Sequence, residues 1–82
     1  MKNDDSLDIL AQLGKRVAYL RKEKGMSQLA LALSSGVAKS YLSELEKGKR
    51  NPTVKVLNKI AIALDLTIEE LFRGVVPLEQ LL

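Results

Sequence analysis

Apolar side chains spaced three or four residues apart along much of the chain favour a protein built from helices. The first series has steps of three, three, four and three residues, as on one face of an α-helix: Leu7, Leu10, Leu13, Val17 and Leu20. Ser6 is a suitable N-cap for this helix. Lys22 and Lys24, followed by Gly25, have the composition of a helix C-terminus. These signals predict a helix over about residues 6–24.

Start and stop signals predict four further helices. Ser27, Thr53 and Thr67 are N-cap residues, and Gly36 and Gly48 stop the helices that precede them. The expected ranges of these helices are about 27–34, 38–47, 54–64 and 68–72. We find no convincing strand in the pattern. The sequence therefore predicts an all-α fold of five helices joined by short loops.

The composition excludes several classes of protein. The 82 residues are enough for one domain, which we place over residues 1–82. The chain has no cysteine and no histidine, which removes disulfides, thiolate metal sites and the commonest general base. We expect no catalytic residues, no metal and no cofactor, and hence no enzyme. The sequence has neither a transmembrane stretch nor the apolar region of a signal peptide, so we expect a cytoplasmic protein.

The second and third predicted helices have the arrangement of a helix-turn-helix motif over about residues 27–47. Ala32 and Gly36 supply small residues where the two helices approach each other. Leu42 and Leu45 would face inward, leaving the polar side of the third helix exposed. The major groove of DNA admits one α-helix, and polar side chains near its N-terminus meet the base edges. The net charge of +3 permits such a partner.

Several short motifs follow one another at a specific spacing. They are RKEKGMSQ at 21–28, LA at 31–32, SGV at 35–37, KSYLSELEKGKRNP at 39–52, Leu57, Ile60-Ala61, Leu64 and EELF at 69–72. Over residues 14–72 this series resembles the phage-repressor (Xre/Cro-like) helix-turn-helix family. The resemblance implies a five-helix, lambda-repressor-like domain that binds double-stranded operator DNA as a homodimer. Restriction–modification controller proteins of this family are similar in size.

The resemblance also implies roles for individual residues. Positions of the third helix that face base edges in the family are matched here by Lys39, Ser40, Ser43 and Glu44. Positions that contact the DNA backbone are matched by Gln28, Tyr41, Lys47, Lys49, Arg50 and Asn51. Arg21 and Glu46 match a pair that ties the first helix to the end of the third.

The chemistry of these side chains agrees with the implied roles. Lys39 can donate to guanine O6 or N7, and Glu44 can accept from cytosine N4. Ser40 can donate or accept and therefore specifies little, and Ser43 can reach either a base or the backbone. The basic loop after the third helix supplies affinity that does not depend on the DNA sequence.

Two features depart from the family's pattern. Ala38 stands where a capping Ser, Thr or Asn is common, so we expect no side-chain cap on the third helix. Leu29 and Leu33 occupy positions that are usually polar, and their spacing of four residues places them on one helix face. That face is either an extra contact surface or incidental.

The C-terminal region predicts a dimer contact. Residues 67–82 carry more apolar side chains than a small domain usually leaves in water. We expect the helix at 68–72 and the tail to pack across a two-fold axis. The residues expected at this contact are Ile68, Leu71, Phe72, Val75 and Val76.

The main hypothesis is a transcriptional regulator, a repressor or controller, that binds a near-palindromic operator through its third helix. The sequence leaves two alternatives open: an antitoxin that binds a toxin protein and autoregulates its operon, and a purely protein-binding adaptor. In the first case Leu29 and Leu33, or the tail, would contact the toxin. RNA polymerase is a further protein partner that the sequence leaves open. No residue distinguishes activation from repression.

Overall fold

A computed structural model describes residues 8–75 of the chain. It contains α1 (Ile9–Glu23), α2 (Gln28–Ser35), α3 (Lys39–Glu46), α4 (Val54–Ala63) and α5 (Ile68–Phe72). Residues 8–75 form no strand, and none of their helices has both the length and the hydropathy needed to cross a membrane. The predicted all-α class and the five helices are confirmed.

The helices begin and end close to the predicted positions, with one difference at the start of the chain. The cap of α1 is Asp8, whose carboxylate accepts a hydrogen bond from the Leu10 N–H at 3.0 Å. Aspartate is as good an N-cap as serine, and its charge suits the helix N-terminus. The helix therefore starts at Ile9 rather than at the predicted residue 6. Ser6, the predicted cap, lies outside the described residues.

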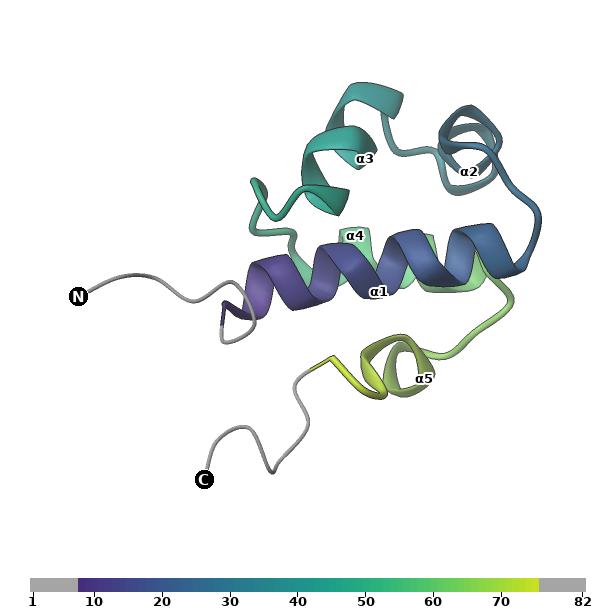
Figure 1. Ribbon diagram of the computed structural model, residues 1–82. Helices are drawn as coiled ribbons and strands as arrows, with labels where there is room; N and C mark the ends of the chain where they lie inside the picture. The colour runs from purple at the N-terminus through teal and green to yellow at the C-terminus, as the bar shows by residue number, and fades with distance from the viewer. Residues whose placement is uncertain (1–7, 76–82) are drawn as a thin grey trace.

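The hydrophobic core lies where all the helices meet. Figure 1 shows α1 running between α5 on one side and the pair α2 and α3 on the other, with α4 behind it. Each helix, or the residue that ends it, contributes to the largest fully buried side chains: Val17, Leu31, Leu42, Leu45, Ile60, Leu64 and Leu71. Because these side chains are all aliphatic, the core depends on close packing rather than on aromatic rings.

The close approach of α1 to α3 depends on a glycine inside α1. A Cβ atom at Gly14 would lie 2.5 Å from the carbonyl oxygen of Leu45 and 2.6 Å from that of Glu46. Both are backbone atoms, so neither can turn aside as a side chain could. Gly14 lowers the helix propensity of α1 but allows the end of α3 to rest against it. The sequence pattern gave us no reason to single out this glycine.

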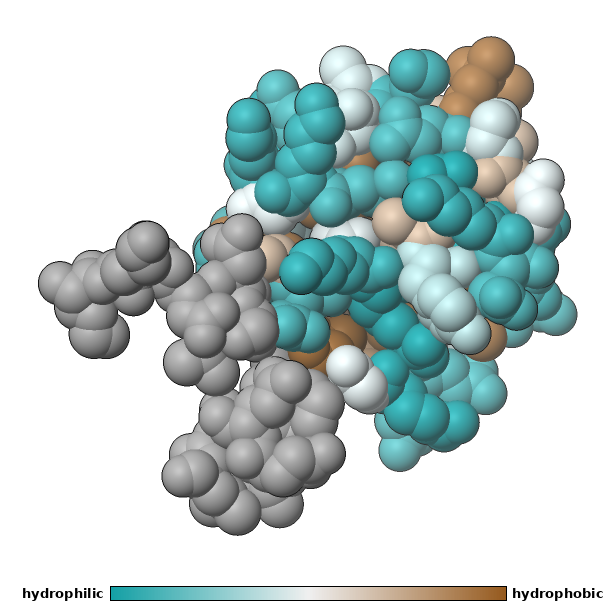
Figure 2. All heavy atoms as spheres, in the orientation of Figure 1, coloured by the Kyte–Doolittle hydropathy of each residue, from teal (hydrophilic) through white to brown (hydrophobic). Residues whose placement is uncertain are grey.

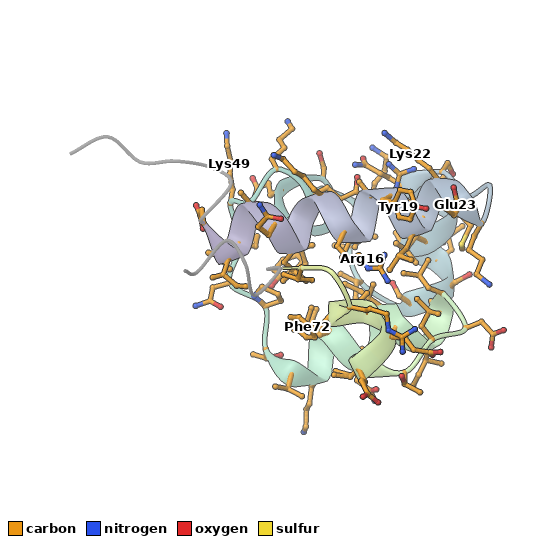
Figure 3. All side chains as sticks on the ribbon, turned by 60° about the horizontal axis from the view of Figure 1, so that its bottom comes forward. Arg16, Tyr19, Lys22, Glu23, Lys49 and Phe72 are labelled. Carbon is orange, nitrogen blue, oxygen red and sulfur yellow. The ribbon has the colours of Figure 1, made fainter. Side chains whose placement is uncertain are left out.

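An arginine on α1 holds α5 in place. Arg16 donates through Nε to the Leu71 carbonyl oxygen at 3.1 Å and through Nη2 to the Glu70 carbonyl oxygen at 2.9 Å. Figure 3 shows its side chain extending from α1 toward α5, with Tyr19 nearby. Carbonyl groups at the end of a helix have no partner within the helix. The guanidinium group therefore gives the Leu71 carbonyl a partner, adds a second donor to the Glu70 carbonyl, which also accepts from the Arg73 N–H at 3.2 Å, and joins elements that are far apart in the sequence.

The start of α5 is stabilised by the predicted capping box. The Thr67 hydroxyl accepts from the Glu70 N–H at 3.1 Å, and the Glu70 carboxylate accepts from the Thr67 N–H at 2.9 Å. The hydrogen bond from the Thr67 N–H to the Glu70 carboxylate is the main reason that the pKa of Glu70 lies below its usual value.

Two of the residues predicted at a dimer contact belong instead to the core of the single chain. Leu71 is fully buried and Val75 is 2% exposed, because α5 packs against α1 and α4. Side chains that are buried within one subunit are not available to another. Ile68 and Phe72 are half-buried at the edge of the core. Val76 lies outside the described residues.

We predict that Gly14→Ala destabilises the protein although alanine is the better helix former. Overpacking of this kind typically costs about 1–3 kcal/mol, against a helix-propensity gain of about 1 kcal/mol. Because the new methyl group would meet backbone atoms, we expect the loss to exceed the gain. The measurement is the free energy of unfolding in urea, with Lys15→Ala at the neighbouring exposed position as the control. A Gly14→Ala variant more stable than the wild type would contradict the close contact of α1 with α3.

Candidate nucleic-acid interface

The turn between α2 and α3 has the geometry of a helix-turn-helix. Gly36 ends α2 in the left-handed conformation, with φ of 75°, and its N–H donates to the Ala32 carbonyl oxygen at 2.9 Å. A Cβ at Gly36 would meet no atom within 4 Å. The glycine is therefore needed for its backbone conformation, and not for the close approach that the sequence suggested. Ala32, the other small residue, is buried at 7% exposure.

Helix α3 has one buried side and one free side. Leu42 and Leu45 are buried in the core, whereas Lys39, Ser40 and Glu44 are exposed. In Figure 1 the outer side of α3 is covered by no other helix. As expected from Ala38, no side chain in residues 8–75 caps the N-terminus of α3. Three of the four predicted base-reading side chains are thus open to a partner, and Ser43 is half-buried.

The loop after α3 is basic and rests on α1. Lys47, Lys49 and Asn51 are exposed in it. Gly48 has φ of 77°, and a Cβ there would lie 2.9 Å from the Cα of Ala11. The loop therefore needs a glycine at its contact with the first turns of α1, where Figure 3 places Lys49. Because Gly48 is packed against α1, the backbone positions of Lys47 and Lys49 on either side of it are fixed.

Arg21 and Glu46 form a nearly buried ion pair between α1 and the end of α3. Arg21 donates from Nε to Glu46 Oε2 at 2.7 Å and from Nη2 to Glu46 Oε1 at 3.0 Å. Its Nη1 donates to the Met26 carbonyl oxygen at 2.8 Å. The hydrogen bonds with Glu46 raise the pKa of Arg21 above its ordinary value. The side chains are 11% and 7% exposed, so each charge depends on the other.

Gln28 belongs to the same network, which the sequence did not indicate. Its side-chain amide donates through Nε2 to Glu46 Oε1 at 3.0 Å. Gln28 is half-buried at the start of α2, so the network joins three helices. Gln28 was predicted to bind a DNA phosphate, but in the free protein its side-chain nitrogen donates to the Glu46 carboxylate.

A second ion pair lies on the surface and joins three predicted DNA-binding residues. Arg50 donates from Nε to Glu44 Oε1 at 2.8 Å. The Cζ atom of Arg50 lies 5.1 Å from the centre of the Tyr41 ring, within the range of a cation–π contact. The sequence implied separate roles for these residues, with Glu44 at a base and the other two at the backbone. The opposite charges of Glu44 and Arg50, on either side of the Gly48 turn, were the sequence signal that could have indicated this ion pair.

Leu29 and Leu33 are exposed on α2, at 53% and 77%. Figure 2 shows a mostly hydrophilic face, with hydrophobic atoms projecting at the corner formed by α2.

Within residues 8–75, no group of three or more acidic side chains is placed to hold a metal ion.

The arrangement of α2, the turn and α3 agrees with a match to known proteins. The model of a helix-turn-helix family matches residues 17–71, from α1 to α5. The chain belongs to this helix-turn-helix family. The family comprises DNA-binding transcriptional regulators, and its match confirms the resemblance that the motifs indicated.

Individual helix-turn-helix relatives align over most of the chain. The transcriptional regulator y4dJ of Sinorhizobium fredii is 43% identical over 65 residues, which are 79% of this chain and 84% of that protein. The restriction–modification controller protein C.AhdI from Aeromonas hydrophila superposes with a TM-score of 0.75 at 43% identity, covering 77% of this chain and 96% of C.AhdI. The chain spans 54% of two longer regulators to which it is 43% identical.

One related structure contains DNA. The controller protein C.Esp1396I has been solved as a tetramer in complex with its natural 35-base-pair operator. It superposes on this helix-turn-helix chain with a TM-score of 0.76 at 31% identity, over 82% of this chain and 88% of the controller.

We predict that Glu46→Ala is much more destabilising than Glu44→Ala. Removing Glu46 leaves Arg21 almost buried without its partner, and breaking a buried pair costs about 3–5 kcal/mol. Glu44 is 48% exposed, and pairs of that kind contribute about 0–1 kcal/mol. Urea unfolding of the two variants gives the comparison, and Glu46→Gln, which keeps an acceptor without the charge, should fall between them. Equal and small losses for both alanine variants would argue against a structural role for Arg21 and Glu46.

Proposed function

We propose that this protein regulates transcription by binding a near-palindromic operator as a homodimer, with α3 of each subunit in a major groove. The observation that carries the proposal is the free polar side of α3, which sits above a fully buried apolar side. An α-helix held in this way fits a major groove. The operator complex of C.Esp1396I supports the proposal, because that controller is similar to this chain over most of its length.

The side chains of α3 read the base edges in this proposal. Lys39 lies exposed in the first turn of the helix and donates to a guanine. Ser40 and Ser43 donate to or accept from neighbouring bases or phosphates. Glu44 lies further along the same side and accepts from a cytosine amino group.

In this proposal the DNA backbone is bound by the loop after α3, by the start of α2 and by Tyr41 of α3. Lys47, Lys49 and Asn51 are exposed in the loop that is seated on α1, and they contact phosphates. Gln28 and Tyr41 contact the backbone from the start of α2 and from α3. These contacts set the orientation of α3 and contribute affinity for any sequence.

The two subunits meet in this proposal through the surface of α5 that remains available. Ile68 and Phe72 are half-buried and supply the apolar part of the contact within the described residues. A two-fold axis at α5 repeats the same surface on both subunits. The two α3 helices then enter successive major grooves about 34–36 Å apart.

The proposal is tested by selecting bound sequences from random duplex DNA at physiological salt. We expect a two-fold motif whose half-sites are centred about one helical turn apart. Sedimentation of the free and the bound protein shows whether two subunits occupy one motif. Selection of no motif at all would contradict the proposal.

We predict that Lys39→Ala relaxes base preference, whereas Lys49→Ala weakens binding to all sequences alike. A specific base contact contributes about 1–3 kcal/mol of discrimination, and a lysine on a phosphate contributes about one unit of salt slope. The measurement is binding to the selected operator and to single-base variants at several salt concentrations. An unchanged base preference in Lys39→Ala would show that α3 reads DNA through other side chains.

A further inference from the structure

The pair of Glu44 and Arg50 places a carboxylate and a guanidinium together on the surface proposed to face DNA. The two side chains are 48% and 50% exposed, and the bond between Arg50 Nε and Glu44 Oε1 is 2.8 Å. The guanidinium also lies over Tyr41, 5.1 Å from the ring centre. Arg50 is therefore held from two sides, both by side chains of α3.

We propose that Arg50 is a specificity-positioning residue that acts through Glu44, rather than an independent phosphate ligand. The inference rests on the proposed function, because it assigns a role within the same DNA-reading surface. It replaces the role that the family resemblance implied for Arg50.

An unpaired carboxylate on this surface would oppose DNA binding. Duplex DNA carries one negative charge per about 1.7 Å of its axis, so a glutamate near it is repelled unless it has a donor. The guanidinium of Arg50 is a fixed donor at hydrogen-bond distance and offsets the charge of Glu44. Glu44 can then approach a base edge with its charge offset before it reaches the DNA.

The geometry leaves half of the carboxylate free for reading. Oε1 of Glu44 accepts from Arg50, whereas Oε2 accepts no hydrogen bond from the other residues of 8–75. A carboxylate oxygen is the acceptor that suits the amino group of cytosine N4. Because Oε1 is bound by Arg50, whose guanidinium lies over the Tyr41 ring, this contact favours an arrangement in which Oε2 remains available to a base.

The ion pair with Glu44 also limits the contribution of Arg50 to binding that does not depend on the DNA sequence. Its charge is offset by Glu44, whereas Lys49, one residue earlier, is exposed and forms no ion pair with residues 8–75. Lys49 therefore contributes to binding of any sequence, and Arg50 contributes mainly where Glu44 finds its base. Replacing Glu44 by glutamine would release the charge of Arg50 to phosphates of every duplex.

The test is a double-mutant cycle of Glu44→Gln, Arg50→Ala and the double variant, with Lys49→Ala as the matched control. Binding is measured to the selected operator, to an operator changed at the base pair that Glu44→Gln no longer discriminates, and to random duplex. We expect Arg50→Ala to reduce discrimination at that base pair about tenfold in the Glu44 protein, and to leave it unchanged in the Glu44→Gln protein. Glu44→Gln should strengthen binding to random duplex and steepen its salt dependence, and the double variant should lose this gain.

Other results overturn the inference. If Arg50→Ala weakens binding to all duplexes by one factor in both backgrounds, as Lys49→Ala does, Arg50 is a phosphate ligand only. If Glu44→Gln leaves the selected motif unchanged, Glu44 reads no base and Arg50 cannot act through it. Arg50→Lys keeps a positive charge beside Glu44 without the planar fork, and we expect it to retain only part of the discrimination that Arg50→Ala loses. Failure of the wild-type protein to select any motif would instead reject the proposed function itself, so the two failures are distinct.

Discussion

The contact of α1 with α3 is the one on which the rest of the structure depends. At Gly14 the backbone at the end of α3 lies so close that α1 has no room for a side chain. Seven residues further along the same face of α1, Arg21 binds Glu46 with two hydrogen bonds. A steric fit and a nearly buried charge pair thus hold the C-terminal end of α3. Its N-terminal half, with Lys39 and Ser40, is left exposed at the surface.

The two ion pairs of the described residues differ in what they can influence. The pair of Arg21 and Glu46 is almost removed from water and fixes the packing of the helices. The pair of Glu44 and Arg50 is half exposed, so it adds little to stability. It instead determines the charge of the exposed side of α3. Both carboxylates of α3 are paired with arginines, while lysines lie exposed in the first turn of α3 and in the loop after it. The surface is therefore suited to an anionic partner although α3 itself contains two acids.

Much of the candidate site could be predicted from the sequence because its parts follow local rules. The polar side of α3 follows from the positions of Leu42 and Leu45 in a helix of known period. The contacts among the site residues follow no local rule. Gln28 and Glu46 are eighteen residues apart in the sequence, and no spacing rule indicates their hydrogen bond. Arg50 meets Glu44 only because the Gly48 turn brings the chain back toward α3.

The sequence by itself determined the five helices, the caps of α2, α4 and α5, and the family to which the chain belongs. These features depend on neighbours within a few residues, which act through backbone hydrogen bonds and apolar periodicity. Only the tertiary structure decided which apolar residues of α5 and of the segment just after it are buried within the chain. Leu71 and Val75 could not be told apart from surface residues by pattern alone, since burial depends on how α5 packs against α1 and α4. The need for glycine at position 14 likewise arises from α3, a helix that the local sequence around α1 does not specify.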